Sequence, residues 1–216
     1  MADAPHLPHV LEDVVVGDLR HYVRDYLDDE VREALESALE AAQRLGARVE
    51  PVTVPDLDRA PGAMLCTIGP NAFDVHRELL ARRAGLLPDD VRLRLEAGAF
   101  VTAADYVRAG RLRHRLRAQL STALGRGDVV LLPTLPTIAP SLDAVDAPVG
   151  ERWTVRSIMS RFTVLANLTG HPAVTIPWGR DARGTGIGIQ LVGPPHQEGD
   201  LLGVAGALER EQVPTC

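Results

Sequence analysis

One stretch near the C-terminal end of the chain decides the fold: Arg161-Phe-Thr-Val-Leu-Ala-Asn-Leu-Thr-Gly-His-Pro-Ala-Val-Thr-Ile-Pro-Trp-Gly179. Apolar side chains recur at helical spacing up to Gly170, which ends the predicted helix, and Pro172 prevents the helix from continuing. The β-branched run over 173–176 lies between two prolines and is typical of a short strand. We therefore predict a helix over 155–169, a tight turn and a core strand.

The residues after this stretch predict a partner for the strand. Residues 180–185 are polar and contain glycine, which indicates a hairpin turn, and residues 188–192 are apolar enough to pair back as a second strand. The motif Gly184-Thr-Gly-Ile-Gly188 resembles a phosphate-binding loop only superficially, because it precedes a strand and does not open a helix. A closing helix is predicted over 200–211.

A strand–helix–strand unit is predicted near the start. Residues 13–17 are a short apolar run, residues 29–45 carry one apolar stripe at helical spacing, and Gly46 can end that helix. Residues 47–54 form the second strand, which Pro51 confines to an edge or a bulge because proline cannot donate to a sheet ladder. A connection of this length favours a parallel, right-handed arrangement.

The middle of the chain is predicted to be mainly helical. The helices expected there cover residues 63–84, 89–97 and 102–124. An interruption of the first at Gly69-Pro70 is left open, and residues 128–133 form another apolar strand. Asp28 and Thr102 are the predicted N-caps of the helices that follow them.

Alternating strands and helices predict an α/β fold. We expect a mixed β-sheet of about five strands flanked by helices, in one domain over residues 13–212 that follows an irregular lead-in over residues 1–12. Length and composition agree with one domain: 216 residues, 45% hydrophobic and 24% charged.

Charge and residue usage argue against several classes of partner. The formal net charge is −6, so neither nucleic acid nor an anionic membrane is an expected partner. The run Arg111-Leu-Arg-His-Arg-Leu-Arg117 is best interpreted as a solvated helix face whose leucines point inward. The sequence has no signal-peptide pattern and no apolar run long enough to span a membrane, which predicts a cytoplasmic location.

No cofactor and no metal is predicted. Two cysteines far apart suggest neither a disulfide framework nor a zinc cluster. His6 and His9 are separated by Pro8 and make a poor metal site. His171 follows a helix-ending glycine, where we expect a turn or core role in preference to that of a base.

Several segments, taken in order, resemble one family. Besides the first strand–helix–strand unit and the stretch quoted above, they are Asp74-Val-His-Arg-Glu-Leu-Leu80, Val91-Arg-Leu-Arg-Leu-Glu-Ala-Gly98, Asp128-Val-Val-Leu-Leu-Pro-Thr134 and Gly188-Ile-Gln-Leu-Val-Gly193. Together they resemble the C-terminal half of amidase-signature enzymes, and they are similar to general amidases and to the glutaminase subunit of tRNA-dependent amidotransferases. The resemblance implies a partial amidase-signature fold with one side of the sheet open, where the signature half would dock.

The resemblance also implies which chemistry is missing from these 216 residues. Enzymes of the family use a lysine, a bridging serine and a nucleophilic serine in a Gly/Ser-rich signature, and all three precede the matched region. Here all 23 basic residues are arginine, and none of the five serines lies in a glycine-rich context. We therefore expect a fragment of an amidase (an amide C–N hydrolase) that is inactive alone and carries no catalytic residue.

Substrate binding is the role the resemblance leaves open. In the amidotransferase relatives an arginine of the 91–98 motif binds the carboxylate of glutamine, and Arg94, with Arg92 beside it, is the nearest match. A solvated helix face or a structural ion pair is the competing interpretation. The expected partners are a separately encoded N-terminal amidase half or a second copy, with a small amide or carboxylate as ligand. A truncated product, a split-enzyme half and a non-catalytic binding module derived from the fold all remain open.

Overall fold

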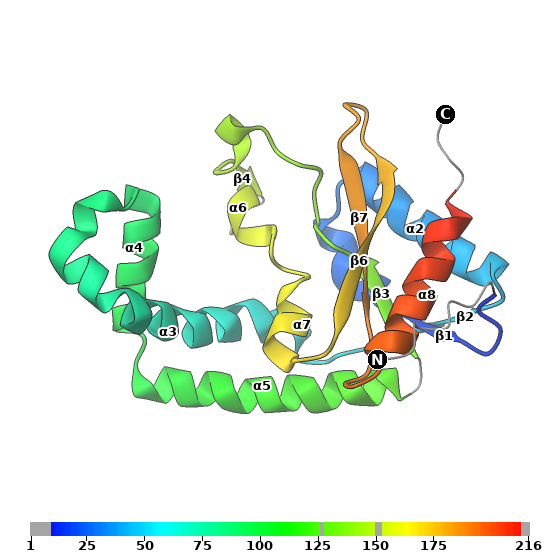
Figure 1. Ribbon diagram of the computed structural model, residues 1–216, viewed down its shortest axis with the longest axis horizontal. Coiled ribbons are helices and arrows are strands. Elements are labelled where there is room, and N and C mark those ends of the chain that lie inside the picture. Colours follow the sequence, from blue (N-terminus) through cyan, green and yellow to red (C-terminus); the bar gives the residue numbers. More distant parts are fainter. Residues whose placement is uncertain (1–9, 126–127, 150–152, 213–216) are drawn as a thin grey trace, which may run out of the picture.

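The computed structural model describes residues 10–125, 128–149 and 153–212 and contains a five-stranded mixed sheet (Figure 1). The strand order is β2-β1-β3-β7-β6. The strands are β1 (Val15–Asp18), β2 (Arg48–Pro51), β3 (Val129–Pro133), β6 (Ala173–Arg180) and β7 (Gly186–Val192). β1 is parallel to β2 and β3, whereas β7 is antiparallel to β3 and to β6. The predicted α/β class and sheet are confirmed.

The first strand–helix–strand unit forms as the sequence predicts, with α2 (Asp29–Arg44) between two parallel strands and Gly46 in a left-handed conformation at φ +98°. β2 is an edge strand that ends at Pro51, where the missing N–H costs no ladder bond. Asp28 occupies the N-cap position of α2 but makes no side-chain cap; its Oδ2 accepts from the N–H of Ile138 at 3.0 Å. Its carboxylate therefore holds a distant loop.

The middle of the chain forms long helices. They are α3 (Ala60–Arg83), α4 (Asp89–Ala97) and α5 (Ala103–Leu124). α3 continues through Pro70, so the interruption left open does not occur. Thr102 caps α5 by accepting from the N–H of Asp105, as predicted. Leucines on one face of α5 are buried where they approach the sheet, whereas Arg111 and Arg117 are exposed.

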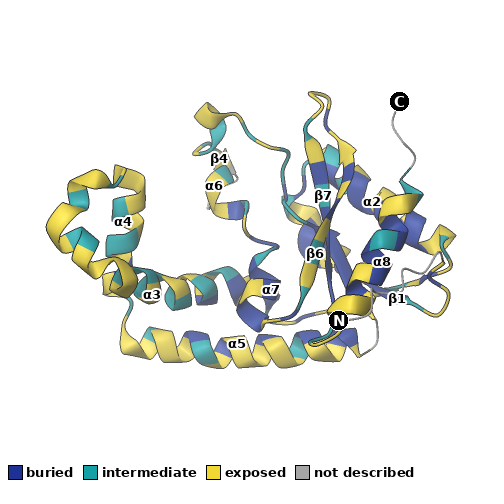
Figure 2. Ribbon diagram, in the orientation of Figure 1, coloured by how far each residue is buried: buried dark blue, intermediate teal, exposed yellow. Residues whose placement is uncertain are grey.

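α3, α4 and the start of α5 project from the sheet as a helical arm, which we define as residues 64–108 (Figure 1). Two 3₁₀ turns lie within it, at Ala84–Leu86 and Gly98–Phe100. Within these residues Gly98 alone is buried, and Figure 2 shows the arm as mainly exposed. The remaining described residues, 10–63, 109–125, 128–149 and 153–212, form the body, which holds the hydrophobic core.

The single helix predicted over 155–169 is wrong. The structure has two short helices, α6 (Val155–Ile158) and α7 (Val164–Thr169), separated by turns. Arg161 and Phe162 lie in the interruption, and both are buried against the same neighbouring segment. That segment comprises α1 (Arg20–Val23) and the 3₁₀ turn Arg24–Tyr26. Because successive residues of an α-helix point about 100° apart, the turns allow two adjacent side chains to reach one surface.

The remaining predicted elements are present. α7 ends at Gly170 with φ +73°, β6 and β7 form a hairpin with Gly184 at φ +81°, and α8 (Glu198–Glu211) packs on them and on α2. Two short segments, β4 (Pro148–Val149) and β5 (Trp153–Thr154), pair in a small ribbon that the sequence did not predict. The predicted lead-in over 1–12 falls mostly on residues 1–9, outside the described residues.

β6 closes one end of the sheet as an exposed edge strand. Ala173, Thr175 and Pro177 are exposed, whereas Ile176 and Trp178 point into the core. α8 covers one side of this hairpin. The unpaired edge of β6 is therefore available for pairing with further polypeptide.

Candidate functional site

The two predicted substrate contacts lie on α4, in the exposed arm. Arg92 is held by its own helix: it donates to Asp89 Oδ1 at 3.1 Å and to the two carboxylate oxygens of Glu96 at 3.0 and 3.1 Å. The hydrogen bonds that Arg92 donates to Asp89 and then to Glu96 raise the pKa of its guanidinium. Its hydrogen-bonding capacity is thus largely directed at neighbours three and four residues away.

Arg94 is held more loosely. Its side chain is 59% exposed, and its Nη2 lies 3.8 Å from Asp90 Oδ2, longer than a hydrogen bond. The guanidinium also contributes to lowering the pKa of Asp146, which lies far along the chain. Of the two arginines, Arg94 is therefore the better placed to bind the carboxylate of a ligand.

Arg94 belongs to a charge cluster that links the arm to the segment before α6. Arg156 donates to both oxygens of Asp146, at 2.8 and 3.1 Å, and its Nη1 lies 3.7 Å from Asp90 Oδ2. The hydrogen bond from Arg156 is the main cause of the lowered pKa of Asp146. We call Asp90, Arg94, Asp146 and Arg156 the arm cluster.

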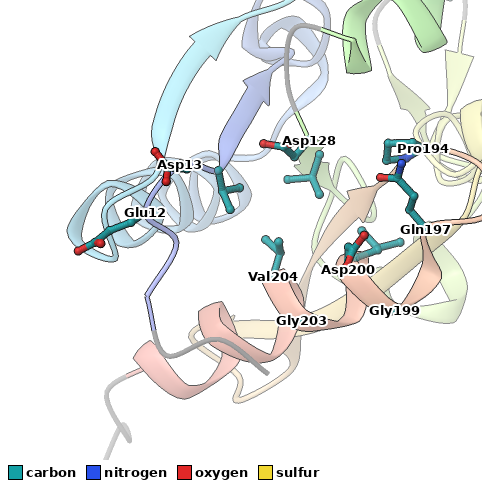
Figure 3. A pocket seen from close by; sticks show the side chains of 12 residues that line it. Glu12, Asp13, Asp128, Pro194, Gln197, Gly199, Asp200, Gly203 and Val204 are labelled. Atoms are coloured by element: carbon teal, nitrogen blue, oxygen red, sulfur yellow. The ribbon is translucent and has the colours of Figure 1, made fainter. Parts of the chain in front are cut away.

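A pocket with a volume of about 450 Å³ lies elsewhere, at the start of β1 and β3 (Figure 3). Glu12, Asp13, Asp128 and Asp200 give it an acidic lining, and Asp128 Oδ2 already accepts from the N–H of Val15 at 2.8 Å. Ligands of open α/β sheets bind at the carboxyl ends of the parallel strands, which is the opposite end. This pocket is therefore a poor substrate site, and neither predicted arginine lines it.

Arg161 is a buried cation that sequence reasoning passed over. Its side chain is 4% exposed, with the guanidinium carbon 4.0 Å from the centre of the Tyr26 ring, and it donates to Asp58 Oδ1 at 2.7 Å and to the Tyr26 hydroxyl at 2.9 Å. These contacts fix the turn between α6 and α7. The sequence offered no signal for them, since Asp58 lies 103 residues away.

Two further features bear on metal and membrane binding. Within residues 10–125, 128–149 and 153–212, no three His, Cys, Asp or Glu side chains are grouped so that they could hold a metal ion. His6 and His9 lie outside the described residues. Among the helices that are described, none is both long and apolar enough to cross a membrane.

The five-stranded mixed sheet with flanking helices defines an α/β protein. The family model of the amidases matches residues 2–202. The chain belongs to the amidase family, as the resemblance predicted.

Named relatives support the assignment. The chain is 31% identical over 209 residues to a fatty acid amide hydrolase from Oryza sativa subsp. indica, covering 95% of this chain and 34% of the relative. It is 35% identical over 128 residues to one subunit of the glutamyl-tRNA(Gln) amidotransferase from Neisseria meningitidis serogroup C, covering 57% of this chain and 26% of the relative. A crystal structure of an amidase superposes with a TM-score of 0.87 at 28% identity and covers 96% of this chain and 48% of that one.

The coverage values show how much of each relative the chain matches. The chain spans about a third of the length of the rice relative and about half of the solved amidase. The described fold therefore corresponds to one part of a larger amidase architecture.

Proposed function

We propose that these 216 residues form the C-terminal part of an amidase, residues 13–212 being the portion of the amidase-signature domain that builds the scaffold and one wall of the substrate site. On this proposal they do not hydrolyse amides until a part bearing the lysine and the Ser-rich signature docks against them. The proposal holds whether the same polypeptide or a separate one carries that part.

The observation that carries the proposal is chemical. Hydrolysis in the family depends on a lysine that takes the nucleophile's proton through a bridging serine, and no lysine occurs among the 216 residues. Ser37, Ser121 and Ser157 lie on helices, Ser160 lies in the turns after α6, and Ser141 precedes the 3₁₀ turn Leu142–Ala144. None follows a glycine-rich turn that could supply backbone N–H donors to a developing oxyanion.

Two surfaces support a docking partner. β6 offers an unpaired edge, and the arm exposes large apolar side chains, including Val75 (77% exposed), Leu86 (71%) and Phe100 (84%). Large apolar side chains left exposed along one part of a fold are a feature of surfaces that pack against a partner. The relatives include one component of a glutamyl-tRNA(Gln) amidotransferase, which accords with a partner.

Within this function we propose Arg94 as the residue that binds the carboxylate or amide of the substrate, with Arg92 in a supporting position. Arg94 is exposed, and its only close carboxylate on α4 lies 3.8 Å away, so a ligand carboxylate would compete with a weak ion pair. Arg92 would first have to release Asp89 and Glu96.

The test begins with the purified 216-residue chain and a panel of primary, aryl and carboxylate-bearing amides. We expect no amide hydrolysis by the chain alone. Co-expression with the Lys- and Ser-bearing part encoded in the same genome should give a complex, seen by size-exclusion chromatography with light scattering, and should restore hydrolysis. Amide hydrolysis by the isolated chain would refute the proposal.

The arginines are tested in the restored complex. Arg94→Gln should raise KM for carboxylate-bearing amides while leaving neutral amides unchanged, and the matched Arg92→Gln variant should have the smaller effect. If the chain forms neither complex nor activity with the Lys- and Ser-bearing part, the alternative is favoured, a non-catalytic module that binds small carboxylates or proteins. The cytoplasmic location stays a prediction.

A further inference from the structure

Two hydroxyl groups and one imidazole, those of Ser121, Thr169 and His171, come together where α5 passes the end of α7. Ser121 Oγ lies 3.2 Å from His171 Nε2, and His171 Nδ1 lies 3.0 Å from Thr169 Oγ1. Ser121 comes from the last turns of α5, Thr169 is the last residue of α7, and His171 belongs to the turn before β6. This trio is outside the arm cluster and does not line the pocket of Figure 3.

The direction of each hydrogen bond follows from the number of protons. Thr169 donates its single hydroxyl proton to the carbonyl oxygen of Leu165, at 2.7 Å. It can therefore only accept from His171, so Nδ1 of the imidazole carries a proton. In the neutral ring Nε2 is then the unprotonated nitrogen, and it accepts the hydroxyl proton of Ser121.

The neutral ring is the favoured form. His171 is 5% exposed, and this burial, followed by the positive charge of Arg117, lowers its pKa from the ordinary 6.5. At neutral pH the imidazole is therefore a proton acceptor facing Ser121. Its orientation is fixed by Thr169, which gives the arrangement nucleophile, base and orienting group.

Ser121 also differs from three threonines that lie on helices. Thr67, Thr122 and Thr169 each donate to the carbonyl four residues earlier, the usual bond for a hydroxyl inside a helix. The Ser121 hydroxyl is instead paired with an imidazole, and the residue is exposed, so a small molecule can reach it. Arg117 lies one turn earlier on the same helix face and is exposed too.

We infer that Ser121 is a nucleophilic hydroxyl, with His171 as its general base, that accepts an acyl group from small activated esters. Ser121 Oγ attacks the carbonyl carbon as its proton passes to His171 Nε2. The C–O bond to the leaving alcohol breaks, and the same proton passes to the leaving oxygen. The products are the acylated Ser121 and the free alcohol. This inference is independent of the proposed amidase function.

The surroundings limit the reaction to good leaving groups. Ser121 lies within α5, where backbone N–H groups are occupied by helical hydrogen bonds, so they cannot stabilise an oxyanion. The Arg117 guanidinium is the nearby positive charge. We therefore expect acyl transfer from aryl esters, slow loss of the acyl group, and no reaction with amides.

The test uses the full chain and p-nitrophenyl acetate. We expect a burst of about one equivalent of p-nitrophenolate per chain, and an acetyl group on Ser121 within the tryptic peptide 118–126, with tandem mass spectrometry separating Ser121 from Thr122. Ser121→Ala should abolish the burst. The matched control is Ser37→Ala, since Ser37 is also an exposed helix serine but has no described imidazole partner, and it should leave the burst intact.

The base is tested separately. His171→Gln should slow acetylation of Ser121 by about 100-fold or more, the usual contribution of general-base catalysis, and Thr169→Val should cause a smaller fall. If these buried variants do not fold, Ser121→Cys provides a second measurement, because iodoacetamide should then label residue 121 faster than Cys66. Three results would each overturn the inference. They are equal acetylation of Ser37 and Ser121, a burst that is unchanged in Ser121→Ala, and labelling of residue 121 in Ser121→Cys that is no faster than labelling of Cys66. Failure of the amidase proposal leaves this burst unaffected.

Discussion

The body and the arm of this protein differ in how much of their apolar surface is buried. In the body most large apolar side chains are covered by the chain itself, and Phe162, Leu120 and Leu165 are at most 1% exposed. In the arm Phe100 is 84% exposed, and Gly98 is the only buried residue between Met64 and Arg108. The difference indicates that the body holds its own hydrophobic core, whereas the arm has the surface of a part that packs against something else.

The largest expected effect comes from two phenylalanines, one in each region. Phe162→Ala should lower the free energy of unfolding by about 3–5 kcal/mol, because it removes a fully buried ring from beside Tyr22 and leaves a cavity. Phe100→Ala, the matched control in the arm, should change it by less than about 0.5 kcal/mol. Urea denaturation of both variants measures the comparison, and equal losses would mean that the arm is packed as tightly as the body.

A smaller effect is expected where the arm closes on itself. A Cβ at position 98 would overlap the carbonyl of Gly69 and lie 3.0 Å from Phe73 Cβ. Gly98→Ala should therefore cost about 1–3 kcal/mol, the usual range for overpacking. Gly110→Ala in α5 meets nothing within 4 Å and should stabilise the protein by about 0.4–1 kcal/mol. In thermal melts, Gly98→Ala should lower the melting temperature and Gly110→Ala should raise it.

The next prediction concerns the pH dependence of the body. Because the folded state lowers the pKa of His171, the unfolded chain binds the proton more readily. The contribution of His171 to stability is therefore complete above about pH 6.5 and is lost as the pH falls from there through the folded pKa. Urea midpoints measured between pH 8 and 5 should fall less steeply in His171→Gln than in the wild type; identical slopes would contradict this.

The smallest effect on stability is expected at the tip of the arm. Val75→Asn and Leu86→Asn replace side chains that are 77% and 71% exposed, so each should change the free energy of unfolding by less than about 0.5 kcal/mol. If the arm is a docking surface, the same variants should weaken association with the Lys- and Ser-bearing part, as sedimentation velocity would detect. If these variants greatly lowered the free energy of unfolding and did not weaken association, the arm would be part of the packed core and not a docking surface.

Local sequence patterns were enough for most of the elements. The helix α2 with Gly46 after it, the N-cap at Thr102 and the α7 end at Gly170 were predicted, because periodicity and turn chemistry act over a few residues. The break between α6 and α7 was missed because its cause is distant: Asp58 and Tyr26 hold Arg161 from 103 and 135 residues away.

The candidate site shows the same limit. Sequence placed Arg92 and Arg94 on a helix, but only the fold revealed that Arg92 is held by Asp89 and Glu96, and that Arg94 lies near Asp146. His171 was predicted to be a turn or core residue and is indeed buried. Its hydrogen bond with Ser121, 50 residues earlier, was beyond any local pattern.

The sequence by itself determined the α/β class, the amidase family and the absence of lysine from these 216 residues. Those properties depend on residue identity and on spacing within one element. Tertiary structure alone decided which arginine is exposed, which serine meets an imidazole, and that residues 64–108 form an arm with little buried surface. The physical reason is that burial, hydrogen-bond direction and pKa depend on groups brought together across the sheet, and their separation along the chain carries no local signal.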